Sequence, residues 1–128
     1  MATSIARLAR ATTVHVGFAF LAMGGWALFA NREHGFARAW APALAQGTLS
    51  GLITLVLKRA LEAMNGRFPG ALAYVAPPAI TAGVILAVLV AIHRLIGTPE
   101  IVRTIAVPWT VSTLYAVVYT ATLVKGAK

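Results

Sequence analysis

The chain has 128 residues, of which 59% are hydrophobic and 11% charged, and its mean hydropathy is +0.82. A soluble domain of this length needs more charge to cover its surface, so the composition excludes an ordinary soluble protein and favours one whose solvent is the lipid bilayer. The net charge of +8 lacks the long basic stretches with interleaved aromatics typical of nucleic-acid binding, and the absence of cysteine excludes disulfides and thiolate chemistry.

Four apolar runs follow one another along the chain. Each reaches or approaches the roughly 20 residues with which a helix crosses about 30 Å of hydrocarbon. Helices are favoured over strands because a helix pairs its backbone groups internally, which lipid requires. We expect one compact all-α transmembrane bundle over residues 1–128, with helices at residues 5–30, 40–64, 78–96 and 99–124.

The first run follows Arg7 and Arg10, a pattern that is also typical of a cleavable signal peptide. The run is long for that role, so we interpret it as the first membrane helix. Thr3 or Ser4 is the expected N-cap, and the helix is expected to end near Asn31.

The second run contains a ladder of polar residues within AQGTLSGLITLVLKRALE, residues 45–62. Its members are four residues apart: Gln46, Ser50, Thr54, Lys58 and Glu62. Ala43, Gly47 and Gly51 fall on the same helical face, where small residues allow two helices to approach closely. The face therefore predicts either a helix-packing interface or the polar lining of a site.

A basic cluster follows this ladder at Lys58, Arg59 and Arg67. These side chains are suited to an anionic head group or phosphate at the mouth of the bundle. The alternative is that they extend to the interface as anchors, which long basic side chains do at helix ends.

The third run is interrupted by Pro77 and Pro78. Two prolines inside a helix would leave the carbonyls of Ala73 and Tyr74 unpaired. We therefore favour a spanning helix that starts at Pro77 or Pro78, with residues 68–76 lying along the interface. A kinked helix that passes through both prolines is the alternative.

The fourth helix is predicted to start at GTPEI, with Thr98 as its cap and Glu100 near the positive end of its dipole. Tyr115 and Tyr119 lie one turn apart on one face. Their rings either line a solute path or pack in the core with their hydroxyls paired to the polar ladder.

The remaining ionisable residues do not form a recognisable catalytic or metal-binding set. His15, His34 and His93 lie at different places along the predicted helices, and a pair at His34 and His93 would lack an evident third ligand. No two of the three glutamates form a pair of catalytic acids. None of the three is expected to lie inside the membrane. We therefore expect no enzyme activity, no metal and no cofactor.

The basic residues are distributed unevenly between the two predicted sides of the membrane. One side has seven: Arg7, Arg10, Lys58, Arg59, Arg67, Lys125 and Lys128. The other has four: Arg32, Arg38, Arg94 and Arg103. The positive-inside rule then places both termini in the cytoplasm, although dual topology stays open. The expected location is a bacterial inner membrane, with anionic lipid head groups as partners.

Two functions are compatible with these patterns. The first is transport or permeation of an anionic or amphiphilic solute, or a lipid, along a path lined by Gln46, Ser50, Thr54, Lys58, Tyr115 and Tyr119. The second is a non-catalytic accessory or scaffold subunit that grips a partner helix through Ala43, Gly47 and Gly51. In both we expect a homo-oligomer or a subunit of a larger membrane complex.

Overall fold

The computed structural model describes residues 2–127, with the side chains of residues 2, 3, 5, 8 and 9 outside the description. It contains four long helices, namely α1 (Ala2–Ala30), α2 (Phe36–Met64), α3 (Leu72–Leu95) and α4 (Ile101–Gly126), and a short 3-10 helix, η1 (Arg32–His34). No strand occurs in the described part of the chain. Helix α1 begins at Ala2, so Thr3 and Ser4 lie inside it and the expected N-cap at either residue is wrong. Lys128, counted above as a cytoplasmic charge, lies outside what is described.

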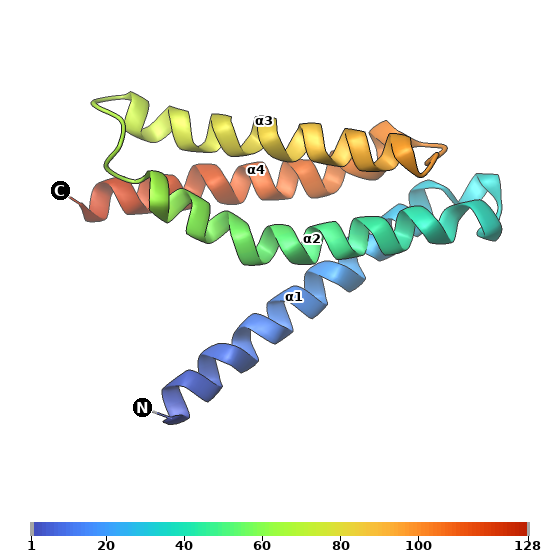
Figure 1. Cartoon of the computed structure of the whole chain (residues 1–128), viewed down its shortest axis with the longest axis horizontal. Helices are drawn as coiled ribbons and strands as arrows, with labels where there is room; N and C mark the ends of the chain where they lie inside the picture. Colours follow the sequence, from blue (N-terminus) through green and yellow to red (C-terminus); the bar gives the residue numbers. More distant parts are fainter. Residues whose placement is uncertain (1, 128) are drawn as a thin grey trace.

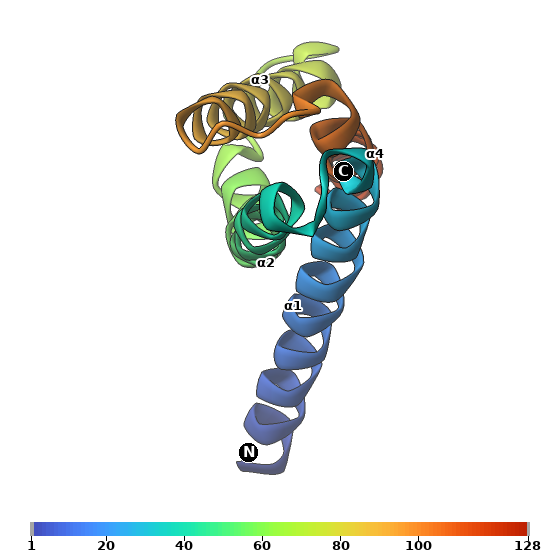
Figure 2. The same ribbon diagram turned by 90° about the vertical axis from the view of Figure 1, so that its right-hand side faces the viewer.

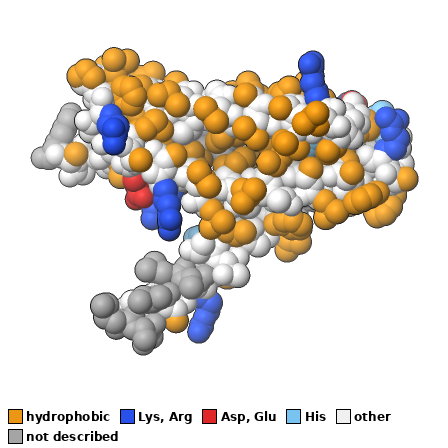
Figure 3. Space-filling model, viewed as in Figure 1, with side chains coloured by type: hydrophobic (Ala, Val, Ile, Leu, Met, Phe, Trp, Pro, Cys, Tyr) orange, Lys and Arg blue, Asp and Glu red, His pale blue; other side chains and the backbone are white. Residues whose placement is uncertain are grey.

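All four long helices are long and apolar enough to cross a membrane, which agrees with the predicted set of helices. The candidate spans are Arg10–Ala30, Phe36–Met64, Leu72–Leu95 and Ile101–Gly126. Hydrophobic side chains cover the middle of the visible face, whereas Lys and Arg side chains gather toward its ends and where α1 leaves the bundle (Figure 3).

Helices α2, α3 and α4 lie together, whereas α1 crosses α2 and then diverges from the other helices toward its N-terminus (Figure 1). The view turned by 90° shows the same divergence (Figure 2). A core cluster of Leu57, Leu61 and Ala116 joins α2 to α4, with Ile85 of α3 packed against it. On the diverging part of α1, Val14 and Phe18 are exposed.

The crossing of α1 and α2 depends on glycine. A Cβ atom added at Gly47 would lie 2.9 Å from the carbonyl oxygen of Phe20, and one added at Gly24 would lie 3.0 Å from the carbonyl oxygen of Ala43. At Gly51 it would lie 3.2 Å from Cγ1 of Val16. The predicted small-residue face of α2 therefore packs against α1 of the same chain, the close backbone approach that such faces permit.

Helix α3 starts earlier than the sequence predicts. It begins at Leu72 and continues through Pro77 and Pro78, so the expected start at the prolines is wrong, as is an interfacial segment that includes residues 72–76. The N–H groups of residues 72–74 donate to the carbonyls three residues earlier, which forms a first turn without any contribution from Pro77 or Pro78. The hydroxyl of Thr81 donates to the carbonyls of Pro77 at 3.0 Å and Pro78 at 3.2 Å.

The start of α4 is capped differently from the prediction. Glu100 is the N-cap residue and makes no capping bond with its own side chain, while Thr98 bonds His93 instead. The buried Asn31, at the end of α1, accepts from the Glu100 N–H through Oδ1 at 2.9 Å and donates through Nδ2 to Oγ1 of Thr104 at 2.8 Å. A residue distant in sequence thus satisfies the free N–H at this helix end.

Helix α2 begins earlier than expected, at Phe36, so Trp40 and Pro42 lie in its first two turns. Gly35 precedes it with a φ of 87°, a conformation that glycine adopts without a steric penalty. The predicted end of this helix at residue 64 agrees with the structure.

Candidate functional site

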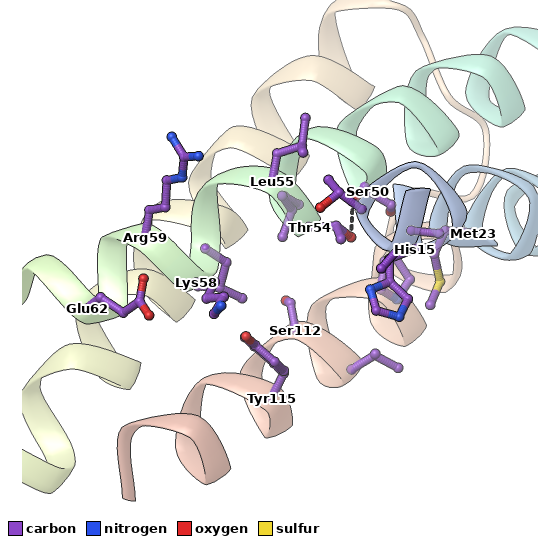
Figure 4. Close-up of a pocket in the computed structure, with 17 residues that line it drawn as sticks. His15, Met23, Ser50, Thr54, Leu55, Lys58, Arg59, Glu62, Ser112 and Tyr115 are labelled. Atoms are coloured by element: carbon purple, nitrogen blue, oxygen red, sulfur yellow. Dashed lines mark hydrogen bonds between the residues drawn. The ribbon is translucent and has the colours of Figure 1, made fainter. Parts of the chain in front are cut away.

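A cleft of about 680 Å³ lies where α1 diverges from α2 and α4. Figure 4 shows the residues of these three helices around it. The helix α1 wall consists of Ala11, Thr12, His15, Ala19 and Met23. The rest of the lining is Ser50, Ile53, Thr54, Leu55, Leu57, Lys58, Arg59, Glu62, Pro108, Val111, Ser112 and Tyr115. About half of these side chains are apolar, and Lys58, Arg59 and Glu62 come from the second half of α2.

Lys58 and Tyr115 extend toward each other from α2 and α4, whereas the guanidinium of Arg59 extends to the opposite side of α2 (Figure 4). Ser112, which is buried, lies one turn before Tyr115 on the α4 wall. Among the described side chains, Lys58 forms no ion pair within 4.0 Å. The cleft therefore contains an ammonium group whose charge is not neutralised by a neighbouring carboxylate.

Glu62 is the only acidic residue in the lining, one turn beyond Lys58 on α2. Its Oε2 accepts a hydrogen bond of 2.6 Å from the hydroxyl of Tyr119. The rings of Tyr119 and Tyr115 stack with their centroids 5.5 Å apart. An acidic and aromatic group thus lies beside the basic group at this part of the cleft.

A buried polar network adjoins the cleft at Ser50. The amide Nε2 of Gln46 donates to Oγ of Ser50 at 2.9 Å, and its Oε1 lies 2.9 Å from Nε2 of His93. Nδ1 of His93 lies 2.7 Å from Oγ1 of Thr98. Gln46 and His93 are both 0% exposed. The amide oxygen of Gln46 only accepts, which in a neutral His93 ring assigns the proton to Nε2 and makes Thr98 the donor to Nδ1.

The predicted site residues fall into three groups. Ser50, Thr54, Lys58, Arg59 and Tyr115 line the cleft together. Gln46 and Tyr119 each bond a residue of its lining. Arg67 lies outside the lining and donates through Nε to the carbonyl of Ala63 at 2.7 Å.

The α1 wall and the partner of Gln46 were missed from the sequence. His15 and Met23 line the cleft because α1 leans away from α4, a geometry that the periodicity of one helix does not contain. His93 could have been found, since a deeply placed amide requires a buried hydrogen-bonding partner and His93 is an uncharged polar residue near the end of the third run.

Groups of ionisable side chains elsewhere do not form a second site. His34 and Arg103 each lie 3.9 Å from Glu100 at the other end of the bundle. Within the described residues there is no group of three His, Cys, Asp or Glu side chains that could hold a metal ion.

The chain was compared with family models, with curated proteins and with solved structures, and none of them matches it. The functional interpretation therefore depends on the cleft and on its side chains.

Proposed function

We propose that this protein is a multipass membrane protein that binds an amphiphile with a phosphate or another acidic head group in the cleft between α1, α2 and α4. Such binding is the step on which transport of a lipid or lipid-like solute depends. The observation that carries the proposal is the unpaired ammonium of Lys58, directed into a cleft with mainly apolar walls.

The chemistry of the lining is matched to the two parts of such a molecule. Met23, Ile53 and Val111 offer apolar contact to acyl chains. Lys58 offers a charged donor to an acidic head group, and the hydroxyls of Ser112 and Tyr115 offer neutral ones. The lining of the cleft thus complements a lipid, with apolar side chains for the acyl chains and charged side chains at one end for the head group.

The proposed site is shorter than the polar ladder of α2. Gln46 is fully buried against α3 through His93, so its amide is already occupied. A solute in the cleft meets α2 from Ser50 to Glu62. We therefore propose a binding cleft at one end of the bundle in place of a path along the whole of α2.

The orientation and location are part of the same proposal. Basic residues favour the end of the bundle that carries Lys58 and Lys125, and the positive-inside rule then makes it cytoplasmic. Both termini are proposed to be cytoplasmic, in a bacterial inner membrane. The head group would lie near the cytoplasmic surface, where anionic lipids meet basic side chains.

The experiment compares Lys58→Gln with Lys125→Gln, a matched control that removes the same charge from an exposed position on α4 outside the cleft. Purified full-length protein is mixed with dioleoyl phosphatidylglycerol, and bound lipid is counted by native mass spectrometry. Lys58→Gln is expected to lower the bound fraction about tenfold, the effect of losing one charge-assisted contact. Equal binding by the two variants would refute the proposal.

A second candidate is the accessory or scaffold subunit. It is favoured by the exposed apolar residues Val14, Phe18 and Leu21 on the diverging helix α1, which a helix of another protein or of a second copy could cover. The face formed by Ala43, Gly47 and Gly51 is occupied by α1, so an interface would have to use other surfaces. The same spectra discriminate this candidate by the mass of a retained protein subunit.

A further inference from the structure

We infer that the head group bound in the cleft is zwitterionic, with a phosphate at Lys58 and a primary ammonium at Glu62, as in phosphatidylethanolamine. The inference rests on the proposed function, since it names the chemical class of amphiphile that this same cleft selects. It derives from the juxtaposition of Lys58, Glu62 and the stacked pair of Tyr115 and Tyr119.

The positive and negative groups of the cleft lie one helical turn apart. Lys58 and Glu62 are residues i and i+4 of α2, a spacing that places their Cβ atoms about 5–6 Å from each other. Both side chains extend toward the α4 side of the cleft (Figure 4). A single head group at this level therefore meets an ammonium and a carboxylate at once.

The two charges do not neutralise each other. Residues four apart on a helix often form an ion pair, yet among the described side chains neither Lys58 nor Glu62 forms one within 4.0 Å. Glu62 instead accepts from the hydroxyl of Tyr119, which holds the carboxylate against α4. Each charged group thus remains available to a ligand charge of the opposite sign.

The surroundings of Glu62 favour a cation. The bond from Tyr119 is made to Oε2 at 2.6 Å, and no hydrogen bond to Oε1 occurs among the described residues. A carboxylate accepts several hydrogen bonds, so this oxygen can take an N–H from a primary ammonium. Tyr115, which lines the cleft and stacks on Tyr119, places an aromatic ring in this part of the cleft, and aromatic rings attract cations.

The separation of the groups matches ethanolamine phosphate. Two carbon atoms link its ester oxygen to its nitrogen, so its two charges lie about as far apart as neighbouring side chains on one helix face. A glycerol head group has the phosphate without the cation and leaves Glu62 facing a second negative charge, which is unfavourable. A choline head group has the cation but no N–H to donate to the carboxylate.

The test measures lipid preference within one sample. Full-length protein is equilibrated with an equimolar mixture of dioleoyl phosphatidylethanolamine and dioleoyl phosphatidylglycerol, and the ratio of the two bound lipids is read by native mass spectrometry. Because both lipids compete for the same folded molecules, the fraction of unfolded protein cancels from this ratio. The variants are Glu62→Gln and a matched control, Glu33→Gln, which removes the same charge from an exposed residue of η1.

We expect the unmodified protein and Glu33→Gln to prefer phosphatidylethanolamine by about fivefold, and Glu62→Gln to bring the ratio close to one. A preference for phosphatidylglycerol in the unmodified protein, or an unchanged ratio in Glu62→Gln, would overturn the inference. If a repeat with phosphatidylcholine in place of phosphatidylglycerol gives equal binding, the role of the N–H donor is overturned.

The variant Lys58→Gln separates failure of the inference from failure of the proposed function. When Lys58→Gln loses both lipids and Glu62→Gln leaves the ratio unchanged, the binding cleft stands and the zwitterionic selectivity is wrong. When Lys58→Gln retains both lipids as well as Lys125→Gln does, the proposed cleft itself is wrong, and the inference is wrong with it.

Discussion

Gln46 has a structural role that its place in the polar ladder does not reveal. Its periodicity groups it with Thr54 and Lys58, which line the cleft, whereas its amide bonds Ser50 and His93 in a fully buried network. A residue's face on a helix is set by its spacing, but its partner is set by the neighbouring helix. The sequence therefore identified Gln46 as a residue that needs a partner without identifying that partner.

The Gln46 network is expected to contribute measurably to stability. Gln46→Ala leaves Ser50 Oγ and His93 Nε2 without their bonds, which should lower the free energy of unfolding by about 1–3 kcal/mol. Thr48→Ala, on an exposed position of the same helix, is the matched control and should change it by less than about 0.5 kcal/mol. Denaturant titration in mixed micelles, followed by circular dichroism, measures both. Similar losses in the two variants would show that the network is energetically unimportant.

At the scale of elements, the number and type of helices could be predicted because hydrophobic length is a local property of the chain. The starts of α3 and α4 could not. Helix α3 gains its first turn from backbone bonds that precede Pro77 and Pro78, and α4 gains its cap from Asn31, about 70 residues earlier. The local rule for caps does not include a partner supplied by another segment, and the local rule that proline favours a helix start does not exclude a turn formed before it.

The packing of α1 on α2 provides a prediction at this scale. Gly47→Ala places a Cβ atom at 2.9 Å from the carbonyl oxygen of Phe20, which the α1 backbone has to move to accommodate. We expect a loss of about 1–3 kcal/mol in the free energy of unfolding, as for other overpacked contacts.

The control for this packing is Gly83→Ala, where a Cβ atom meets nothing within 4 Å. Alanine has the higher helix propensity, so this variant should be neutral or more stable by up to about 1 kcal/mol. Both free energies come from the same denaturant titration. If Gly47→Ala behaves like Gly83→Ala, α1 does not pack closely on this face of α2.

At the scale of the whole molecule, the cleft arises from the divergence of α1 from a bundle formed by the other three helices (Figure 2). The sequence contains both faces that line the cleft on α2 and α4, so five of the eight predicted binding residues are found there. The angle at which α1 crosses α2 cannot be predicted in this way, because it depends on how the glycines of the two helices fit together. The α1 wall was therefore unpredictable from helix periodicity alone.

We propose that a phospholipid occupies the cleft between α1, α2 and α4. An electron cryomicroscopy structure of the full chain in nanodiscs containing phosphatidylethanolamine and phosphatidylglycerol tests it most directly. We predict lipid density with its phosphate in contact with the Lys58 ammonium and its acyl chains between α1 and α4. A cleft that is closed by α1 packed along α4, or filled by a helix of another subunit, would contradict the account.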